Sequence, residues 1–427
     1  MTTLENLYSR FLECSGVCTD TRNVLEGGLF IALKGPNFNA NGFAKEALEK
    51  GSRFVVVDDP DVVLDERFLL VKDGLSALQN LATHHRRHFT IPVIGITGTN
   101  GKTTTKELVH AVLGADRPTL ATIGNLNNHI GVPLTLLRLT KEHRIAIIEM
   151  GANKIGDIAE LVAIAEPTYG AITNVGKAHL EGFGSFEGVV TAKTEMYQYI
   201  QVHSGSLFVN ADDDLLMAKS KGAVRVTYGR DLKANTVGNA SGSGPFLEIT
   251  FTGHNGSLFR ATTRLIGDYN LHNALLAVAI GQHFNVPDQR IADSLTAYVP
   301  SNNRSQFTDT GKNELILDAY NANPTSMKAA LENFAAIRTD RPKLMILGDM
   351  RELGAESAQE HSAIVDLAER LSLETVFIGT EFEKVRKSGY VNVQDLLIAL
   401  KDQPVTGKLI LVKGSRGIKL ETVVGVL

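Results

Sequence analysis

Short apolar runs alternate with amphipathic stretches over most of the chain. A run of four or five apolar residues is typical of a strand buried in a parallel sheet, and apolar residues three or four positions apart are typical of a helix packed against it. Near the start of the chain, the runs 29–33 and 54–57 predict strands, and the stretches 44–50 and 75–89 predict helices. Gly51 follows the shorter helix as a stop signal. Residues 1–90 therefore predict a small mixed α/β unit.

The helix predicted over 75–89 ends in a basic cluster, His84-His85-Arg86-Arg87-His88. Cations near a helix C-terminus are favoured by the helix dipole. A nucleic-acid site usually presents a wider basic surface than five residues of one helix end. We therefore expect a solvated helix end here.

The alternation starts again at Pro92. The run 93–96 predicts a buried strand, and a helical pattern follows it after a glycine-rich turn. The remaining predicted elements are a helix at 103–113, strands at 144–148 and 170–175, an antiparallel hairpin formed by 247–252 and 257–265 around His254-Asn255-Gly256, and a helix at 271–284. Because strands and helices alternate, the segment 91–299 predicts a mostly parallel sheet.

A second α/β pattern begins near residue 300. It predicts strands at 315–317, 343–347, 375–378 and 408–412, with helices at 326–337, 357–371 and 393–400 between them. This order resembles a Rossmann-type open sheet. The sequence thus predicts an α/β protein of three domains, with boundaries at 1–90, 91–299 and 300–427.

Composition agrees with a globular chain of this size. At about 150 residues per domain, 427 residues suggest about three domains. Hydrophobic residues make up 43% and charged residues 21%, which excludes disordered and collagen-like chains. The net charge of −4 argues against a general nucleic-acid coat.

Cysteine usage and the N-terminal residues bear on location. Cys14 and Cys18 lack the partners of a disulfide framework or a zinc site, so we expect two ordinary thiols. The first residues lack the basic start and apolar run of a signal peptide, and no apolar stretch is long enough to span a membrane. We expect a cytoplasmic protein with no membrane partner and no nucleic-acid partner.

The strongest chemical signal is a phosphate-binding loop between a predicted strand and a predicted helix. Its residues are Gly98, Thr99, Asn100, Gly101, Lys102, Thr103 and Thr104. Backbone N–H groups of such a loop point at phosphate oxygens, and the helix N-terminus adds a partial positive charge. Lys102 is expected to reach the β- and γ-phosphates, and the Thr103 hydroxyl to bind Mg²⁺. The usual first glycine of the pattern is Ile96, so this loop is a variant.

The string Gly98-Thr99-Asn100-Gly101-Lys102-Thr103 resembles the ATP loop of the Mur ligase family, which includes folylpolyglutamate synthases. Strings in all three predicted domains resemble the same family: 19–22 and 28–33, 124–133, 318–327, 348–354 and 413–417. The resemblance covers nearly the whole chain. The strings 124–133 and 318–327 favour the branch of the family that adds a dipeptide.

The resemblance implies an ATP-dependent amide ligase of peptidoglycan precursor synthesis. Such an enzyme would activate the carboxylate of UDP-N-acetylmuramoyl-tripeptide (UDP-MurNAc-tripeptide) as an acyl phosphate, and D-alanyl-D-alanine would then attack. A sister ligase adding lysine or diaminopimelate to the dipeptide precursor is the main alternative. A folate ligase and a nucleotide-dependent switch without ligase chemistry are weaker alternatives. We expect a monomer whose substrates are small molecules.

The resemblance also implies a metal site, with two Mg²⁺ ions. Glu149 follows an apolar run, where a carboxylate would reach the edge of the sheet. By resemblance Thr103, Glu149, His179 and Lys193 hold the metals, with Lys193 as a carbamate. Taken alone, Glu149 would more often cap a helix, His179 would be structural, and Lys193 would be a surface residue.

The resemblance also implies residues that bind ATP and residues that act in catalysis. The resemblance places Asn270 and Asn273 near adenine, Arg304 at the γ-phosphate and Asp318 at the ribose hydroxyls. Helix capping is the alternative role for Asn270. Catalysis is expected to rest on Lys102, His179, Lys193 and Arg304. Because ATP ligands come from both the second and the third domain, we expect the third domain to close over the nucleotide.

Substrate contacts are expected at both ends of the chain. By resemblance Thr21, Arg22 and Asn41 meet the UDP end of the precursor, although relatives commonly carry His in place of Asn41. Asn128 is expected to contact substrate. Tyr320, Asn321 and Asn323 are expected to line the side from which the dipeptide enters.

Overall fold

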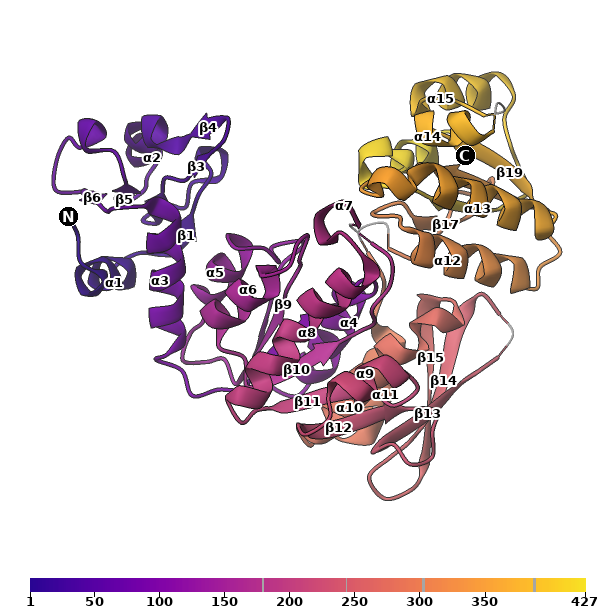
Figure 1. Ribbon diagram of the computed structural model, residues 1–427, viewed down its shortest axis with the longest axis horizontal. Helices are drawn as coiled ribbons and strands as arrows, with labels where there is room; N and C mark the ends of the chain where they lie inside the picture. Colours follow the sequence, from indigo (N-terminus) through magenta and orange to yellow (C-terminus); the bar gives the residue numbers. More distant parts are fainter. Residues whose placement is uncertain (179, 243, 302–303, 387–388) are drawn as a thin grey trace.

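The computed structural model describes residues 1–427 except 179, 243, 302–303 and 387–388. The described residues form three main sheets, which follow one another along the long axis of the molecule (Figure 1). The N-terminal sheet lies at one end, the nine-stranded central sheet in the middle, and the C-terminal sheet at the other end. The α/β class predicted from the sequence is confirmed.

The N-terminal sheet has four parallel strands in the order β1-β2-β5-β6. A short antiparallel ribbon, β3 with β4, lies beside it. The bounds are β1 (Val17–Cys18), β2 (Leu29–Ile31), β3 (Lys34–Gly35), β4 (Phe38–Asn39), β5 (Phe54–Val57) and β6 (Phe68–Leu70), with helices α1 (Leu4–Leu12), α2 (Ala44–Glu49) and α3 (Gly74–Arg86). Cys14 is half-buried and Cys18 buried, both as free thiols.

Helix α3 connects this sheet to the central part of the chain. It packs against α1 and also against α5 (Gly131–Leu136) and α6 (Asp157–Ala165). The predicted solvated helix end is confirmed for Arg87 and His88, which are exposed, but not for His85 and Arg86, which are only 5% and 6% exposed. The Arg86 guanidinium donates to the carbonyls of Phe89, Ala165 and Glu166 at 2.6–3.2 Å. It therefore satisfies carbonyls that the C-terminus of α6 leaves without intrahelical donors.

The central sheet has the order β15-β14-β13-β12-β11-β10-β7-β9-β8. The seven strands from β13 to β8 pair in parallel, and β14 and β15 continue the sheet as an antiparallel hairpin. The strand bounds are β7 (Val93–Thr97), β8 (Thr119–Ala121), β9 (Ile145–Glu149), β10 (Tyr169–Ile172), β11 (Ser206–Asn210), β12 (Val224–Gly229), β13 (Thr236–Ser241), β14 (Phe246–Thr252) and β15 (Leu258–Ile266). Strands β8, β11, β12 and β13 were not predicted from the sequence.

Two hydrophobic clusters cover the two faces of this sheet. Neighbouring residues of one strand, such as Ile147 and Ile148 of β9, belong to different clusters, as the alternation of side chains requires. One cluster includes α5, α6 and α8, and the other includes α4, α10 and α11. The remaining bounds are α4 (Lys102–Gly114), α7 (Leu180–Phe183), α8 (Phe186–Val202), α9 (Asp214–Lys219), α10 (Leu271–His283) and α11 (Asp288–Ala297).

The C-terminal sheet has the order β16-β17-β20-β18-β19, with β16 antiparallel at one edge and the other strands parallel. Its strands are β16 (Gln306–Asp309), β17 (Glu314–Asp318), β18 (Lys343–Gly348), β19 (Glu374–Ile378) and β20 (Leu409–Lys413). Its helices are α12 (Pro324–Ala336), α13 (Ser357–Arg370), α14 (Thr380–Val385) and α15 (Val393–Asp402). The open parallel arrangement predicted for this part is confirmed.

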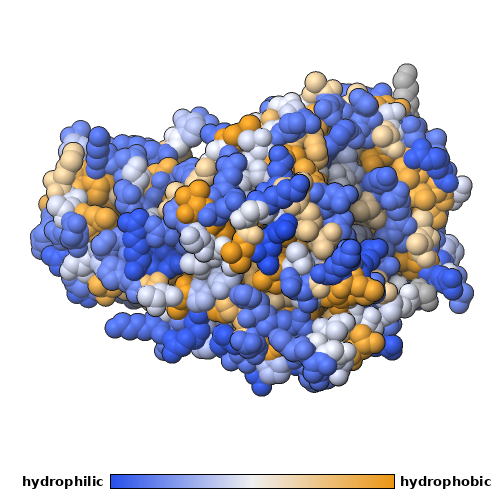
Figure 2. Space-filling model, turned by 60° about the horizontal axis from the view of Figure 1, so that its bottom comes forward, coloured by the Kyte–Doolittle hydropathy of each residue, from blue (hydrophilic) through white to orange (hydrophobic). Residues whose placement is uncertain are grey.

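On the face shown in Figure 2, hydrophobic side chains form small groups separated by hydrophilic ones. No helix within the described ranges combines the length and the apolarity needed to cross a bilayer.

Replacing Arg86 by Met tests its role at the end of α6. The change keeps the apolar stem but leaves the buried carbonyls without donors, so the free energy of unfolding should fall by about 2–4 kcal/mol. Urea unfolding followed by circular dichroism measures it. The control is Arg87→Met, which breaks the exposed pair with Glu166 and should cost under about 1 kcal/mol. Equal losses in the two variants would contradict the role given to Arg86.

Candidate functional site

The phosphate loop connects β7 to α4 and is shaped by two glycines with positive φ. Gly98 has φ +139° and Gly101, at the start of α4, has φ +78°. A Cβ on Gly98 would lie 3.0 Å from the backbone N of Thr173, and one on Gly101 would lie 2.6 Å from Oδ1 of Asn273. The loop therefore leaves no room for side chains at these two positions. This strand–loop–helix arrangement is the one predicted.

Two residues after β10 hold this loop in shape. Thr173 Oγ1 donates to the Asn100 carbonyl at 2.6 Å, and Asn174 bonds both the carbonyl and the N–H of Asn100 at 2.9 and 3.0 Å. Because β10 lies beside β7, these side chains meet the loop where it leaves the sheet. The loop is thus organised by the protein itself.

Lys102 lies at the first position of α4 and turns back over its own loop. Its Nζ donates to the carbonyls of Gly98 and Thr99 at 2.8 and 2.9 Å. Burial is the main reason that its pKa is lowered to about 8, although Glu149 opposes the shift. The amine therefore lies within the loop where phosphate is expected.

Glu149 ends β9 directly below the loop and is 1% exposed. Its Oε1 accepts from the Thr103 hydroxyl at 3.0 Å and from Asn127 Nδ2 at 2.8 Å. Its buried Oε2 has no hydrogen-bond partner. An unpartnered buried carboxylate oxygen beside a threonine hydroxyl suits a hard cation such as Mg²⁺, so these residues fit a metal ion. Asn127 was not among the residues that sequence reasoning selected, although it lies in the asparagine-rich string 124–133.

Of the other two predicted metal ligands, His179 and Lys193, the structure describes only Lys193. His179 lies outside the described residues. Lys193, on α8, is 3% exposed, which excludes the surface role considered above. Burial, and secondarily the charge of Lys102, lower its pKa to about 7, and its Nζ lies 5.4 Å from the centroid of the Phe183 ring. Within the described part of the chain, no three His, Cys, Asp or Glu side chains group as metal ligands.

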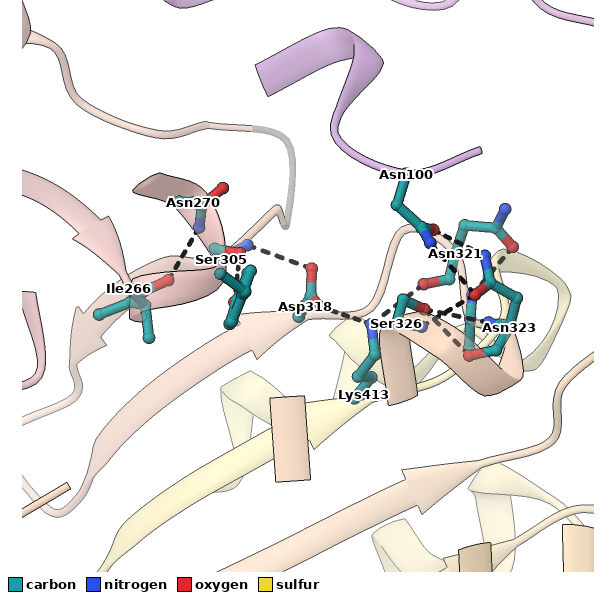
Figure 3. A network of polar contacts seen from close by, with 11 residues as sticks. Asn100, Ile266, Asn270, Ser305, Asp318, Asn321, Asn323, Ser326 and Lys413 are labelled. Atoms are coloured by element: carbon teal, nitrogen blue, oxygen red, sulfur yellow. Dashed lines mark hydrogen bonds and ion pairs between the residues drawn. The ribbon is translucent and has the colours of Figure 1, made fainter. Parts of the chain in front are cut away.

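The two predicted adenine residues form one buried hydrogen-bond chain. Asn273 Nδ2 donates to Asn270 Oδ1 at 2.8 Å, and Asn273 Oδ1 accepts from Thr105 at 3.1 Å. Asn270 Nδ2 donates to the carbonyl of Ile266 at 2.8 Å (Figure 3). Capping of α10 by Asn270 is thus ruled out, since its side chain makes no capping bond.

Asp318 ends β17 and joins two other segments of the cleft (Figure 3). Its Oδ2 pairs with Lys413 Nζ at 2.5 Å, and its Oδ1 accepts from the N–H of Ser305 at 3.2 Å. Lys413 is 1% exposed and also donates to the carbonyl of Asn321 at 3.4 Å. Our sequence analysis identified the string containing Lys413 but assigned it no role.

Two arginines lie against one tyrosine ring. The Arg304 guanidinium carbon is 3.7 Å from the centroid of the Tyr320 ring, and that of Arg416 is 5.2 Å away. Arg416 Nη1 also donates to the Tyr320 hydroxyl at 3.4 Å. Arg416, like Lys413, belongs to the string 413–417 and was not selected from the sequence.

The phosphate loop contacts the C-terminal part of the chain directly. Asn323 Nδ2 donates to Asn100 Oδ1 at 2.7 Å, while Asn323 Oδ1 caps α12 by accepting from the N–H of Ser326 (Figure 3). Nearby, Lys177 Nζ bonds Glu360 at 2.8 Å. The predicted dipeptide residue Asn323 is therefore engaged in a contact between the two parts.

A cleft of about 1310 Å³ lies between the central and C-terminal parts. Of the predicted residues, its lining includes Thr99, Asn100, Gly101, Lys102, Thr103, Thr104, Asn128, Glu149, Asn270, Asn273, Arg304, Asp318, Tyr320 and Asn321. The structure thus brings together most of the residues expected for ATP and its metal. Asn128 also accepts from the N–H groups of Ile130 and Gly131 at the start of α5.

The residues expected at the UDP end are not part of this cleft. Arg22 is exposed and pairs with Asp20 at 2.6 Å, a contact that also lowers the pKa of that carboxyl to about 2. Thr21 accepts from Lys50 through its carbonyl. Asn41 is 1% exposed, and its amide bonds Asn39 and Asp58. Their predicted contact with substrate stays a prediction.

Gly98→Ala tests whether the loop binds nucleotide. A Cβ there would meet the backbone after β10 and would force an L-residue into a positive-φ conformation. ATP affinity should fall at least about 10-fold with the fold retained, as measured by calorimetry and circular dichroism. Gly124→Ala is the matched control, because Gly124 has φ +56° but open space around it. The nucleotide assignment fails if Gly98→Ala binds ATP as tightly as the wild type.

The chain is similar to known proteins over nearly its whole length. Residues 96–281 match the family described as Mur ligase middle domain, and residues 303–417 match Mur ligase, glutamate ligase domain. The UDP-N-acetylmuramoyl-tripeptide–D-alanyl-D-alanine ligase of Bacillus subtilis is 36% identical, covering 96% of this chain and 92% of that protein.

Two solved structures have the same overall arrangement. MurF from Acinetobacter baumannii has a TM-score of 0.87 at 30% identity, covering 99% of this chain and 98% of that one. MurF ligase from Thermotoga maritima, solved in complex with ADP, has a TM-score of 0.83 at 25% identity, covering 97% of each chain. With near-complete coverage by relatives above 30% identity, the chain belongs to the Mur ligase family.

Proposed function

We propose that this chain is an ATP-dependent ligase that joins D-alanyl-D-alanine to UDP-MurNAc-tripeptide. The observation that carries the ligase chemistry is the buried Glu149 below the phosphate loop, with one carboxylate oxygen unpartnered, facing a cleft shared with the C-terminal part. The full-length similarity to ligases with this name supports the choice of substrates. The ADP complex of the Thermotoga maritima relative supports the choice of nucleotide.

The reaction starts from a carboxylate, which is a poor acylating agent. A carboxylate does not release its oxygen readily, so the ligase transfers the γ-phosphoryl group of ATP to it, giving an acyl phosphate and ADP. The dipeptide amine then attacks the acyl carbon, phosphate leaves, and the amine proton passes to solvent or a nearby base. The first step brings two anions together, the triphosphate and the carboxylate, so it needs fixed cations in a closed site.

The residues of the cleft meet this need. Lys102 and the backbone N–H groups of its loop would hold the β- and γ-phosphates, and Arg304 would reach the γ-phosphate from the other wall. Asn270 and Asn273 would hold the adenine, and Asp318 the ribose. The contact between Asn100 and Asn323 supports closure of the C-terminal part over the nucleotide. Closure would also exclude water from the acyl phosphate.

Magnesium belongs to the same proposal. Thr103 and Glu149 would hold one Mg²⁺ ion, and Lys193 and His179 would contribute to a second. A bound Mg²⁺ neutralises charge on the triphosphate and on the reacting carboxylate. The single unpartnered oxygen of Glu149 supports the first site.

Lys193 is proposed to carry a carbamate. The uncharged amine would attack CO₂, forming an N–C bond and releasing one proton, which turns a cation into an anion able to bind metal. Burial supports this, because the pKa of about 7 leaves much of the amine uncharged at neutral pH. Among the described residues, no side chain pairs with its Nζ through a hydrogen bond or ion pair, so the amine is not already engaged.

The substrate is proposed to span the molecule. Its UDP end would meet Thr21, Arg22 and Asn41 in a domain of residues 1–90, its peptide would pass Asn128 in a domain of 91–299, and the dipeptide would enter past Tyr320, Asn321 and Asn323 in a domain of 300–427. We further propose that the enzyme works as a monomer in the cytoplasm. The separate sheets of the three parts support these boundaries.

The reaction is tested by phosphate release from ATP with UDP-MurNAc-tripeptide, with and without D-alanyl-D-alanine. Release and a product of the expected mass should both require the dipeptide. If release instead requires the dipeptide precursor with lysine or diaminopimelate, the sister ligase is correct. Glu149→Gln is expected to lower the rate at least about 100-fold, because it removes the charge that holds the metal. ATP turnover that ignores every such pair would overturn the ligase assignment.

Carbamylation is tested by ¹³C NMR of the protein in ¹³C-bicarbonate. A carbamate signal should appear, grow as the pH rises from 6 to about 8, and be absent in Lys193→Ala, since only the uncharged amine reacts. Lys193→Ala should be inactive and partly restored by a short carboxylic acid. The control is Lys219→Ala, which removes an exposed lysine of α9 and should keep both the signal and the activity. An unchanged signal in Lys193→Ala would exclude the carbamate.

A further inference from the structure

The cleft contains five lysine and arginine side chains, and they differ in how their charges are compensated. They are Lys102, Lys154, Arg304, Lys413 and Arg416. Lys413 is paired with Asp318, and Lys102 bonds the carbonyls of its own loop. Among the described residues, Lys154, Arg304 and Arg416 have no carboxylate partner. These three cations are therefore available to an anionic ligand.

Arg416 is held in place on the C-terminal wall of the cleft. β17 and β20 are parallel neighbours with Asp318 opposite Lys413, so the residues that follow them lie side by side. Tyr320 follows the first strand, and Arg416 follows the second. The Arg416 side chain lies 5.2 Å from the ring centroid of Tyr320 and donates to its hydroxyl at 3.4 Å. A guanidinium supported in this way keeps its remaining N–H groups directed outward as donors.

Arg304 also lies against the Tyr320 ring, but its charge acts on Lys102 of the phosphate loop. It lies near enough to Lys102 for its charge to contribute to the lowered pKa of that amine. Arg304 therefore lies at the end of the cleft nearest the phosphate loop. Arg416 is exposed and is the cation of the C-terminal wall that remains for another anion.

The second substrate supplies such an anion. An amine must be uncharged to attack an acyl phosphate, so the attacking dipeptide keeps one charge, the carboxylate at its other end. Arginine binds carboxylates through two parallel hydrogen bonds, which fixes orientation as well as position. We propose that Arg416 binds the C-terminal carboxylate of the incoming dipeptide and that Tyr320 is the positioning residue that holds this guanidinium. This inference rests on the ligase function proposed above.

The test compares D-alanyl-D-alanine with its C-terminal amide, which lacks only the negative charge. The wild type should have a KM for the acid about 10- to 100-fold below that for the amide. Arg416→Gln should raise the KM for the acid to that for the amide, with the KM values for ATP and UDP-MurNAc-tripeptide unchanged. Arg416→Lys should restore part of the difference, because it returns the charge without the paired donors.

Two control variants separate this role from a general loss of positive charge. Arg370→Gln removes an exposed arginine at the end of α13, outside the cleft, and should keep the wild-type ratio of the two KM values. Lys154→Gln removes a cation from the opposite wall and should also keep the wild-type ratio of the two KM values.

Three outcomes would overturn the inference. The first is a wild-type ratio in Arg416→Gln. The second is a rise in the KM for ATP or for the nucleotide precursor in place of the dipeptide. The third is that Lys154→Gln, and not Arg416→Gln, removes the difference between the KM values for the acid and the amide. These outcomes presuppose an active wild type, so they leave the proposed function standing. A wild type that makes no product from D-alanyl-D-alanine overturns the proposed function and this inference together.

Discussion

The parallel pairing of β7 with β9 is the constraint on which the rest of the site depends. It sets Ile96 opposite Glu149, so the phosphate loop and the carboxylate leave the sheet at the same edge and from adjacent strands. The hydroxyl of Thr103, the second residue of α4, then reaches Glu149 at 3.0 Å. β10, on the other side of β7, adds the two side chains that hold the loop. Three parallel strands thereby fix the loop, its supports and the unpartnered carboxylate oxygen of Glu149.

Charge compensation gives the cleft its second property. Lys193 is buried and Lys102 is half-buried. Burial lowers the pKa of each amine, and a neighbouring cation adds to the shift: Arg304 for Lys102, and Lys102 for Lys193. Lys413 is already neutralised by Asp318, so that pair serves to fix the ends of β17 and β20. The site therefore combines cations that organise the protein with cations that remain available to ligands.

The sequence predicted the local features well. The phosphate loop, the strand that ends at Glu149 and the hairpin at 254–256 all depend on neighbouring residues, and the structure confirms them. The burial of Arg86 could not be predicted, because its partners lie at the end of α6, about 80 positions away.

The same limitation applies within the site. Asn127 bonds Glu149 across 22 positions, and Arg416 meets Tyr320 across 96. Strand β12 was missed because only two of its six residues are buried, so it lacks a clear apolar run. What escaped sequence reasoning is therefore mainly polar contact between distant segments.

The packing of α3 has a consequence for the order of substrate binding and domain closure. One continuous hydrophobic cluster runs from α1 and α3 into α5, α6 and the central sheet. The C-terminal part meets the phosphate-loop side through the polar contacts Asn100–Asn323 and Lys177–Glu360, and its apolar packing against the central part lies at the β14–β15 hairpin, where Ile266 and Phe246 join the C-terminal cluster. We therefore expect the first two parts to move as one stiff body and the third to swing about the hairpin. A long substrate lying along the stiff body loses its translational freedom before the swing begins. Under the proposed function, only the attacking dipeptide then still has to be brought to the site when the C-terminal part closes. Its effective concentration beside the bound substrate would be high.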